Sequence, residues 1–130
     1  MNPPLTSIAI VEDDAGMRSS LMEVLASDPG FACLGAFASA EEALAGLPAL
    51  SPQVVLMDIN LPGISGIEAM KILRADPSTA HIPIIALSAN AIPRDIERAL
   101  EAGFFDYVTK PIKVNQFMDA LDVALKFAQT

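Results

Sequence analysis

The segment VVLMDINLPGISG, residues 54–66, decides the fold class of this chain. Its first four residues, Val54 to Met57, are all apolar, which is typical of a strand that is covered on both faces. Gly66 to Arg74 then has the apolar spacing of a helix. A strand followed closely by a helix is the repeating unit of α/β proteins with a parallel sheet. The segment therefore predicts one βα unit of such a sheet.

The same alternation continues on both sides of this unit. Further strands are predicted at Ser7–Val11, Phe31–Phe37, Ile84–Leu87 and Phe105–Thr109, and further helices at Ala15–Ser27, from Ser39 onward, at Arg94–Ala102 and at Val114–Phe127. Ser39 with Glu42 three residues later forms a capping box, and Pro93 and Gly103 suit a helix start and a helix end. The pattern predicts five βα units in a flavodoxin-like, doubly wound three-layer sandwich with a parallel sheet of order 2-1-3-4-5.

Length and composition narrow the class of protein. The 130 residues fit one domain, with a core over about residues 6–128 and no output domain. Hydrophobic residues make up 52% of the chain, and Cys33 is its single cysteine, so a disulfide framework is excluded. A net charge of −8 without a basic stripe argues against nucleic-acid binding by this domain. No signal peptide or membrane-spanning run is visible, which predicts a cytoplasmic protein that does not contact the membrane.

Polar or charged residues follow four of the five predicted strands. Glu12 and Asp13 come after the first strand, Asp58 after the third, Ser88 after the fourth and Lys110 after the fifth. The second strand, which lies at an edge in this order, has none. Because the carboxyl ends of parallel strands share one edge of the sheet, these side chains should form a single site at the point where the strand order reverses.

The residue types at this edge indicate phosphoryl transfer. Glu12, Asp13 and Asp58 would lie within a few ångströms, where like charges repel one another unless a cation joins them. Oxygen ligands with free positions suit Mg²⁺. Lys110 is a point charge that can reach a phosphoryl group, and Ser88 offers a hydroxyl donor. Asp14, the next acidic residue, is expected to cap the first helix instead of joining the site.

The chain also resembles the receiver domain of bacterial response regulators, the CheY-like superfamily. The resemblance lies in the segments IVEDD (Ile10 to Asp14), LMDINLPGISG (Leu56 to Gly66), ALSA (Ala86 to Ala89) and DYVTKP (Asp106 to Pro111). It implies that Asp58 is the phosphoacceptor and that Mg²⁺ is bound by Asp13 directly, by Glu12 partly through water, by Asp58 and by the main-chain carbonyl of Asn60. It also implies that Ser88 and Lys110 hold the phosphoryl oxygens, that Tyr107 changes rotamer on activation, and that the Lys110–Pro111 peptide is cis.

The function implied by this resemblance is that of a switch. The domain would take a phosphoryl group from a histidine kinase or a phosphotransfer protein and then control a downstream target. It would catalyse only its own phosphorylation and dephosphorylation. Partners, including a second copy in a possible homodimer, would use the face formed by the fourth helix, the fifth strand and the fifth helix, where Arg94, Arg98 and Asp106 lie.

Two other functions use similar parts. A magnesium-dependent hydrolase with an aspartyl-phosphate intermediate usually has its nucleophile after the first strand and a second Asp two residues later, whereas here Asn60 stands two residues after Asp58. A flavin-binding module of the same fold class would need a phosphate loop after the first strand. Three acidic residues stand there instead and would repel a flavin phosphate.

Overall fold

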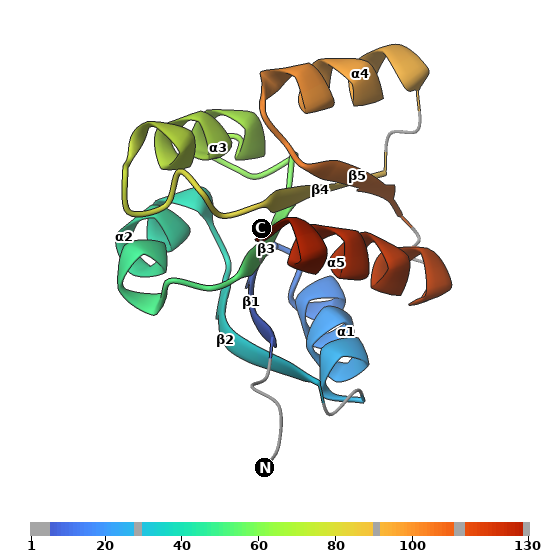
Figure 1. The fold of residues 1–130 in the computed structure, drawn as a ribbon. Coiled ribbons are helices and arrows are strands. Elements are labelled where there is room, and N and C mark those ends of the chain that lie inside the picture. Colours follow the sequence, from blue (N-terminus) through green and yellow to red (C-terminus); the bar gives the residue numbers. More distant parts are fainter. Residues whose placement is uncertain (1–5, 28–29, 90–91, 111–113, 129–130) are drawn as a thin grey trace.

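The computed structural model describes residues 6–27, 30–89, 92–110 and 114–128. Strands and helices alternate through these residues (Figure 1). The strands are β1 (Thr6–Val11), β2 (Phe31–Phe37), β3 (Val54–Asp58), β4 (Ile84–Ser88) and β5 (Asp106–Thr109), and the helices are α1 (Ala15–Ala26), α2 (Ala40–Leu50), α3 (Gly66–Ala75), α4 (Pro93–Ala102) and α5 (Val114–Ala128). The predicted order of elements is confirmed, and every predicted end agrees with the structure to within one residue.

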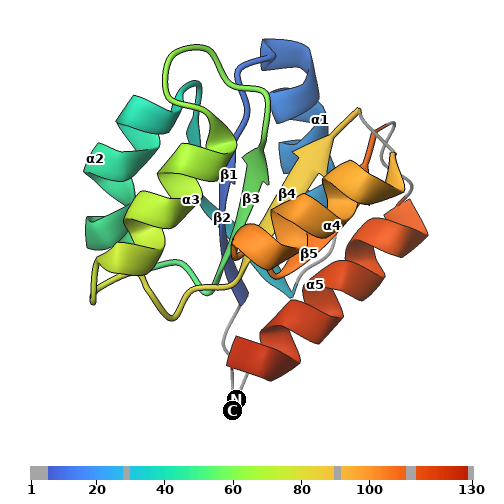
Figure 2. The same ribbon diagram turned by 90° about the horizontal axis from the view of Figure 1, so that it is seen from above.

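The strands form one parallel sheet in the order β2-β1-β3-β4-β5, as predicted. Helices α2, α3 and α4 cover one face, and α1 and α5 cover the other (Figures 1 and 2). The central strand β3 is buried throughout, and its side chains contribute to both apolar clusters. Two covered faces explain why the central strands are apolar without alternation. No helix in the described part of the chain is long and apolar enough to cross a membrane.

Strands β3 and β4 extend one residue further at their carboxyl ends than predicted, and this places site residues in the sheet. Asp58 is the last residue of β3 and pairs with Leu87 of β4, while Ser88 ends β4 and pairs with Thr109 of β5. A polar residue after an apolar run usually indicates the start of a loop, so the sequence predicts strand ends at Met57 and Leu87. The ladder extends over it because the neighbouring strand offers a hydrogen-bond partner at the same level. The positions of Asp58 and Ser88 are therefore set by the sheet.

Local side-chain bonds fix the helix starts. Asp14 is the N-cap of α1, where its Oδ1 accepts from the N–H of Gly16 over 2.9 Å, which confirms the prediction for this residue. Ser39 is the N-cap of α2 and its Oγ accepts from Glu42 N over 3.2 Å. The return bond of the capping box differs from the usual one, because the Glu42 carboxylate accepts from Ala38 N, one residue before the cap.

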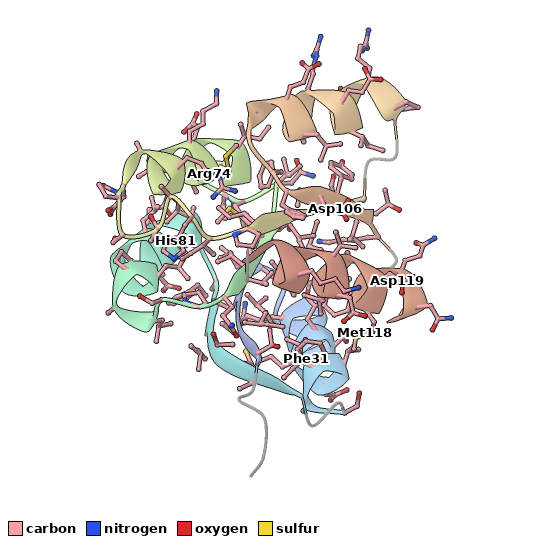
Figure 3. All side chains as sticks on the ribbon, viewed as in Figure 1. Phe31, Arg74, His81, Asp106, Met118 and Asp119 are labelled. Atoms are coloured by element: carbon pink, nitrogen blue, oxygen red, sulfur yellow. The ribbon has the colours of Figure 1, made fainter. Side chains whose placement is uncertain are left out.

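The end of α3 is tied to α4 by one arginine. The guanidinium of Arg74 donates to the main-chain oxygens of Ala80 at 3.2 Å, Ile82 at 2.5 Å and Gly103 at 3.1 Å (Figure 3). Gly103 has φ +134° and ends α4, as the sequence predicted. Arg74 therefore connects the α3–β4 loop to the last turn of α4, at the end of the sheet opposite the predicted site. Pro111 lies outside the described residues, so the predicted cis peptide stays a prediction.

Candidate functional site

The carboxyl ends of four strands bring the predicted residues to one place. Glu12 follows β1 directly, and its N–H donates to Phe37 O of β2 over 2.9 Å. Asp58 and Ser88 end β3 and β4, and Lys110 follows β5, with its N–H bonded to Ser88 O over 2.8 Å. Glu12 is fully buried, Asp58 is 4% exposed and Ser88 is 2% exposed. These three side chains are therefore shielded from bulk solvent at the edge of the sheet.

Lys110 joins the two buried carboxylates. Its Nζ lies 2.6 Å from Glu12 Oε1 and 3.2 Å from Asp58 Oδ2, although the three residues come from three separate strand ends. Charge-assisted hydrogen bonds of this kind are about twice as strong as neutral ones. The ammonium group offsets part of the repulsion between the two carboxylates and contacts one oxygen of each.

The acidic residues form a group that fits a divalent cation. One carboxylate oxygen from each of Glu12, Asp13 and Asp58 lies within 4.8 Å of the other two. Asp13 is exposed, so this group opens to solvent on one side. Glu12 Oε2 is buried and accepts no hydrogen bond from any part of the chain that the structure describes. A buried carboxylate oxygen without a donor is costly unless a positive ligand satisfies it, and a cation among these three carboxylates would do so.

Burial and charge also change the protonation of this group. Burial raises the pKa of Glu12 from its ordinary 4.5 to about 7, and the adjacent Asp58 carboxyl adds to the effect, against the opposing influence of Lys110. Burial alone would lower the pKa of Lys110, but the hydrogen bond to Glu12 and the charges of Asp58 and Glu12 outweigh it and raise that pKa. Lys110 therefore stays charged, and Glu12 gains or loses its proton near neutral pH.

Asn60 lies next to the carboxylates through its main chain. Its N–H donates to Asp58 Oδ1 over 2.9 Å, so the two oxygens of Asp58 have different partners: Asn60 on one and Lys110 on the other. The Asn60 side chain is exposed. The expected role of this residue, a main-chain carbonyl ligand, depends on the course of the loop that follows β3.

A cavity of about 250 Å³ adjoins the site and is lined by Asn60, Ser88 and Tyr107, together with Asp95 and Arg98 of α4. Ser88 and Tyr107 therefore share one cavity, as the expected switch requires. Tyr107 is half-buried and packs against the cluster between the sheet and α2, α3 and α4. The structure thus brings all seven expected residues to this end of the sheet, in two groups: the charged group around Asp58 and the cavity group around Tyr107.

One residue at the site was not expected from the sequence. Arg18 on α1 donates from Nη1 to Glu12 O over 2.8 Å and reaches Asp13 O at 3.5 Å. It holds the main chain of the acidic loop without neutralising a carboxylate. The sequence offered one signal for this role, an arginine about one and a half helical turns after the acidic pair. An arginine at such a position is more often exposed to solvent on the helix surface.

Comparisons with known proteins agree with this geometry. The family model of the response regulator receiver domain matches residues 8–122. The chain is 36% identical over 115 residues to the polar-differentiation response regulator DivK of Brucella ovis, covering 88% of this chain and 92% of DivK. Some curated relatives are longer: the chain spans 29% of a protein-glutamate methylesterase of Desulfitobacterium hafniense and 51% of the DNA-binding response regulator MtrA of Mycolicibacterium paratuberculosis.

Solved structures give the same result. The signal receiver domain of a modulated diguanylate cyclase of Desulfovibrio desulfuricans superposes with a TM-score of 0.83 at 29% identity, covering 96% of this chain and 97% of the other. The receiver domain of sensor histidine kinase PA1611 of Pseudomonas aeruginosa, which has a magnesium ion coordinated in its active site cleft, gives a TM-score of 0.81 at 28% identity over 97% and 99% of the two chains. The chain therefore belongs to the response regulator receiver domains, and its role is that of a phosphoacceptor in two-component signalling.

Proposed function

We propose that Asp58 is the residue that accepts the phosphoryl group. The observation that carries this is the setting of its carboxylate, which is buried at the end of β3 with Lys110 Nζ at 3.2 Å from Oδ2 and Asn60 N–H on Oδ1. Oδ2 forms the new bond to phosphorus while the bond from phosphorus to the donor breaks. Lys110 then donates a hydrogen bond to one phosphoryl oxygen, and the Ser88 hydroxyl donates to another.

We propose that Mg²⁺ is held by Glu12, Asp13, Asp58 and the main-chain carbonyl of Asn60. The support is the group of carboxylate oxygens within 4.8 Å and the buried Glu12 Oε2 that has no hydrogen-bond donor among the described residues. The bound ion would offset the negative charge of the phosphoryl oxygens. Lys110 keeps the two buried carboxylates together and stays close enough to contact the phosphoryl group.

The same reasoning defines the partners and the activity. We propose that a histidine kinase or a phosphotransfer protein supplies the phosphoryl group in the cytoplasm. The domain works as one unit with its core over residues 6–128, catalyses only its own phosphorylation and dephosphorylation, and signals to a downstream target. A hydrolase of small phosphate esters is not favoured, because the family match is to receivers and Asn60 stands where such enzymes carry a second Asp.

We propose that Ser88 and Tyr107 carry the signal from Asp58. A phosphoryl group adds charge and strong acceptor oxygens, and Ser88 can move toward them, which changes the cavity that Tyr107 also lines. Moving an equilibrium from 1:99 to 99:1 takes about 5.5 kcal/mol, and one charge-assisted hydrogen bond supplies about 1.5–3 kcal/mol. The unphosphorylated domain should therefore already sample the active state, with phosphorylation shifting the populations.

We propose the face formed by α4, β5 and α5 as the docking surface for partners and for a second copy. Arg94 and Arg98 are exposed on α4, while Asp106 starts β5 and Asp119 is exposed on α5 (Figure 3). In a two-fold dimer, basic groups of one copy can face acidic groups of the other. The cavity with Ser88 and Tyr107 lies under α4, which would connect phosphorylation to this face.

The phosphoacceptor can be tested by labelling. With a small phosphoryl donor and Mg²⁺, the wild type should form an acid-stable, base-labile acyl phosphate, and Asp58→Asn should abolish it because the nucleophile is lost. Asp76→Asn, the same change at a residue after α3, should label normally. A chelator should block wild-type labelling. Label that persists in Asp58→Asn rejects the acceptor, and undiminished label with chelator rejects the metal.

The raised pKa of Glu12 predicts how stability depends on pH. The folded state holds an extra proton on Glu12 between pH 4.5, its ordinary pKa, and about 7. Stability of the metal-free protein should therefore fall as pH rises through this window, by up to about 3 kcal/mol. Glu12→Gln should remove the decline, and Mg²⁺ should reduce it by favouring the ionised carboxylate. Denaturant unfolding in chelator measures this, and equal slopes for wild type and Glu12→Gln would contradict it.

The switch can be tested by NMR with beryllofluoride as the phosphoryl analogue. In the wild type, the analogue should shift the resonances of α4 and of Tyr107. Ser88→Ala should greatly reduce these shifts while the analogue still binds, because the hydroxyl donor is missing. Ser27→Ala, which removes a hydroxyl that bonds Val24 O at the end of α1, should respond as the wild type does. A full response in Ser88→Ala would show that the hydroxyl does not couple the sites.

Sedimentation tests the docking surface as a dimer interface. With the phosphoryl analogue, the wild type should shift toward a dimer, and Arg94→Glu should weaken that dimer by placing like charges at the interface. Lys71→Glu, an exposed charge reversal on α3, should leave the dimer intact. A monomer that does not change on adding the analogue, or equal effects of both substitutions, would remove the dimer from this proposal.

A further inference from the structure

The loop between β3 and α3, residues 59–65, is attached to the sheet at both ends. Ile59 N donates to Leu87 O of β4 over 3.0 Å, and Gly66 N donates back to Ile59 O over 3.0 Å. A Cβ on Gly66 would collide with the main-chain oxygen of Asp58, so the start of α3 lies directly against the end of β3. The loop leaves and returns at the phosphoacceptor, and Asn60 is its second residue.

The middle of this loop is held from a different helix. Glu41, in the first turn of α2, accepts a hydrogen bond at Oε1 from Ile64 N over 2.8 Å. The N–H of Ile64, together with the N–H of Glu41 itself, lowers the pKa of this carboxyl, so the acceptor is charged at neutral pH. This bond ties the middle of the loop to a helix that lies 23 residues earlier in the chain.

The absence of a side chain at Gly63 leaves room for the Glu41 carboxylate. Its φ is +75°, a conformation that favours glycine. A Cβ at this position would lie 2.6 Å from Glu41 Oε1, closer than a carbon and an oxygen can approach. The carboxylate therefore lies directly over the main chain of Gly63 while it accepts from the next N–H. The backbone turn and the side chain from α2 fit each other.

We propose that Glu41 is a positioning residue for the phosphoacceptor site, which sets the course of residues 60–65 and so the position of the Asn60 carbonyl for the metal. This proposal rests on the proposed function, in which that carbonyl is a ligand. Ordering the backbone of a loop costs free energy, so a loop that is already held loses less freedom when its carbonyl binds an ion. Glu41 itself touches neither the metal nor the phosphoryl group.

The chain contains a matched control one residue away. Glu42 is exposed, lies in the same helical turn and carries the same charge, but its carboxylate accepts from Ala38 N at the start of its own helix. Glu42→Ala therefore removes a charge and weakens the cap of α2 without releasing the loop. Glu41→Gln is the complementary control, because its amide oxygen can still accept from Ile64 N–H although the charge is gone.

The first test measures Mg²⁺ affinity by calorimetry on the full chain. Glu41→Ala should weaken Mg²⁺ binding by about 3- to 10-fold, less than the roughly 10- to 100-fold typical of groups bonded directly to a ligand. Glu41→Gln and Glu42→Ala should each stay within about twofold of the wild type, because small changes in surface charge are screened by salt. Thermal unfolding in chelator checks that each variant is folded.

The second test needs no metal. Amide hydrogen exchange, followed by NMR, should show faster exchange at Ile64 in Glu41→Ala but not in Glu41→Gln or Glu42→Ala. Gly63→Ala approaches the same contact from the loop side, because its methyl group would displace the carboxylate. Because Gly63 has φ +75°, an alanine there also strains the turn, so its effect on Mg²⁺ affinity should be at least as large as that of Glu41→Ala.

The outcomes separate the two proposals. If the wild type binds Mg²⁺ and Glu41→Ala binds it equally well, the positioning role is overturned and the proposed function stands. If Glu41→Gln or Glu42→Ala loses as much affinity as Glu41→Ala, the effect is one of charge, and the positioning role is again overturned. If the wild type binds no Mg²⁺, the metal site of the proposed function fails, and the role of Glu41 in it fails with it.

Discussion

The interaction on which the rest of the site depends is the contact of Lys110 with two buried carboxylates. Glu12 is fully buried and Asp58 is nearly so, and the two carboxylates would repel each other without a counter-charge. Removing a charge from water costs several kcal/mol, so both carboxylates stay ionised only with a close counter-charge. Lys110 Nζ, at 2.6 Å and 3.2 Å from the two, supplies one. Glu12 Oε2 still lacks a hydrogen-bond donor among the described residues, and a cation bound there would satisfy it.

The sheet makes this arrangement possible because its stability comes from the apolar clusters on its two faces and not from the charged residues at its edge. The strands bury apolar side chains on both faces, each worth about 1.5–3 kcal/mol. Their ends can therefore carry groups that destabilise the fold. Asp58 and Ser88 are held in the ladder itself, which gives the charged group and the cavity around Tyr107 a rigid common base. In the proposed switch, a response that begins at Asp58 would reach α4 through this cavity.

The loops complete the site through contacts made across the fold. Arg18 on α1 holds the main chain of Glu12 and Asp13, and Glu41 on α2 holds the loop that contains Asn60. Both act on backbone groups and neither belongs to the carboxylate cluster. Loops at the edge of a parallel sheet have few partners of their own, so their shape depends on side chains that reach them from neighbouring helices.

The sequence by itself determined the order of the elements, the parallel sheet and the residues at its active edge. Apolar strands without alternation and polar residues such as Asp58 and Lys110 at their ends are local signals, and parallel topology turns them into one site. Only the tertiary structure decided that Lys110 bonds Glu12 more closely than Asp58, that Ser88 and Tyr107 share a cavity, and that Arg18 and Glu41 fix the loops. These facts depend on distances between residues up to 98 positions apart, which no local pattern encodes.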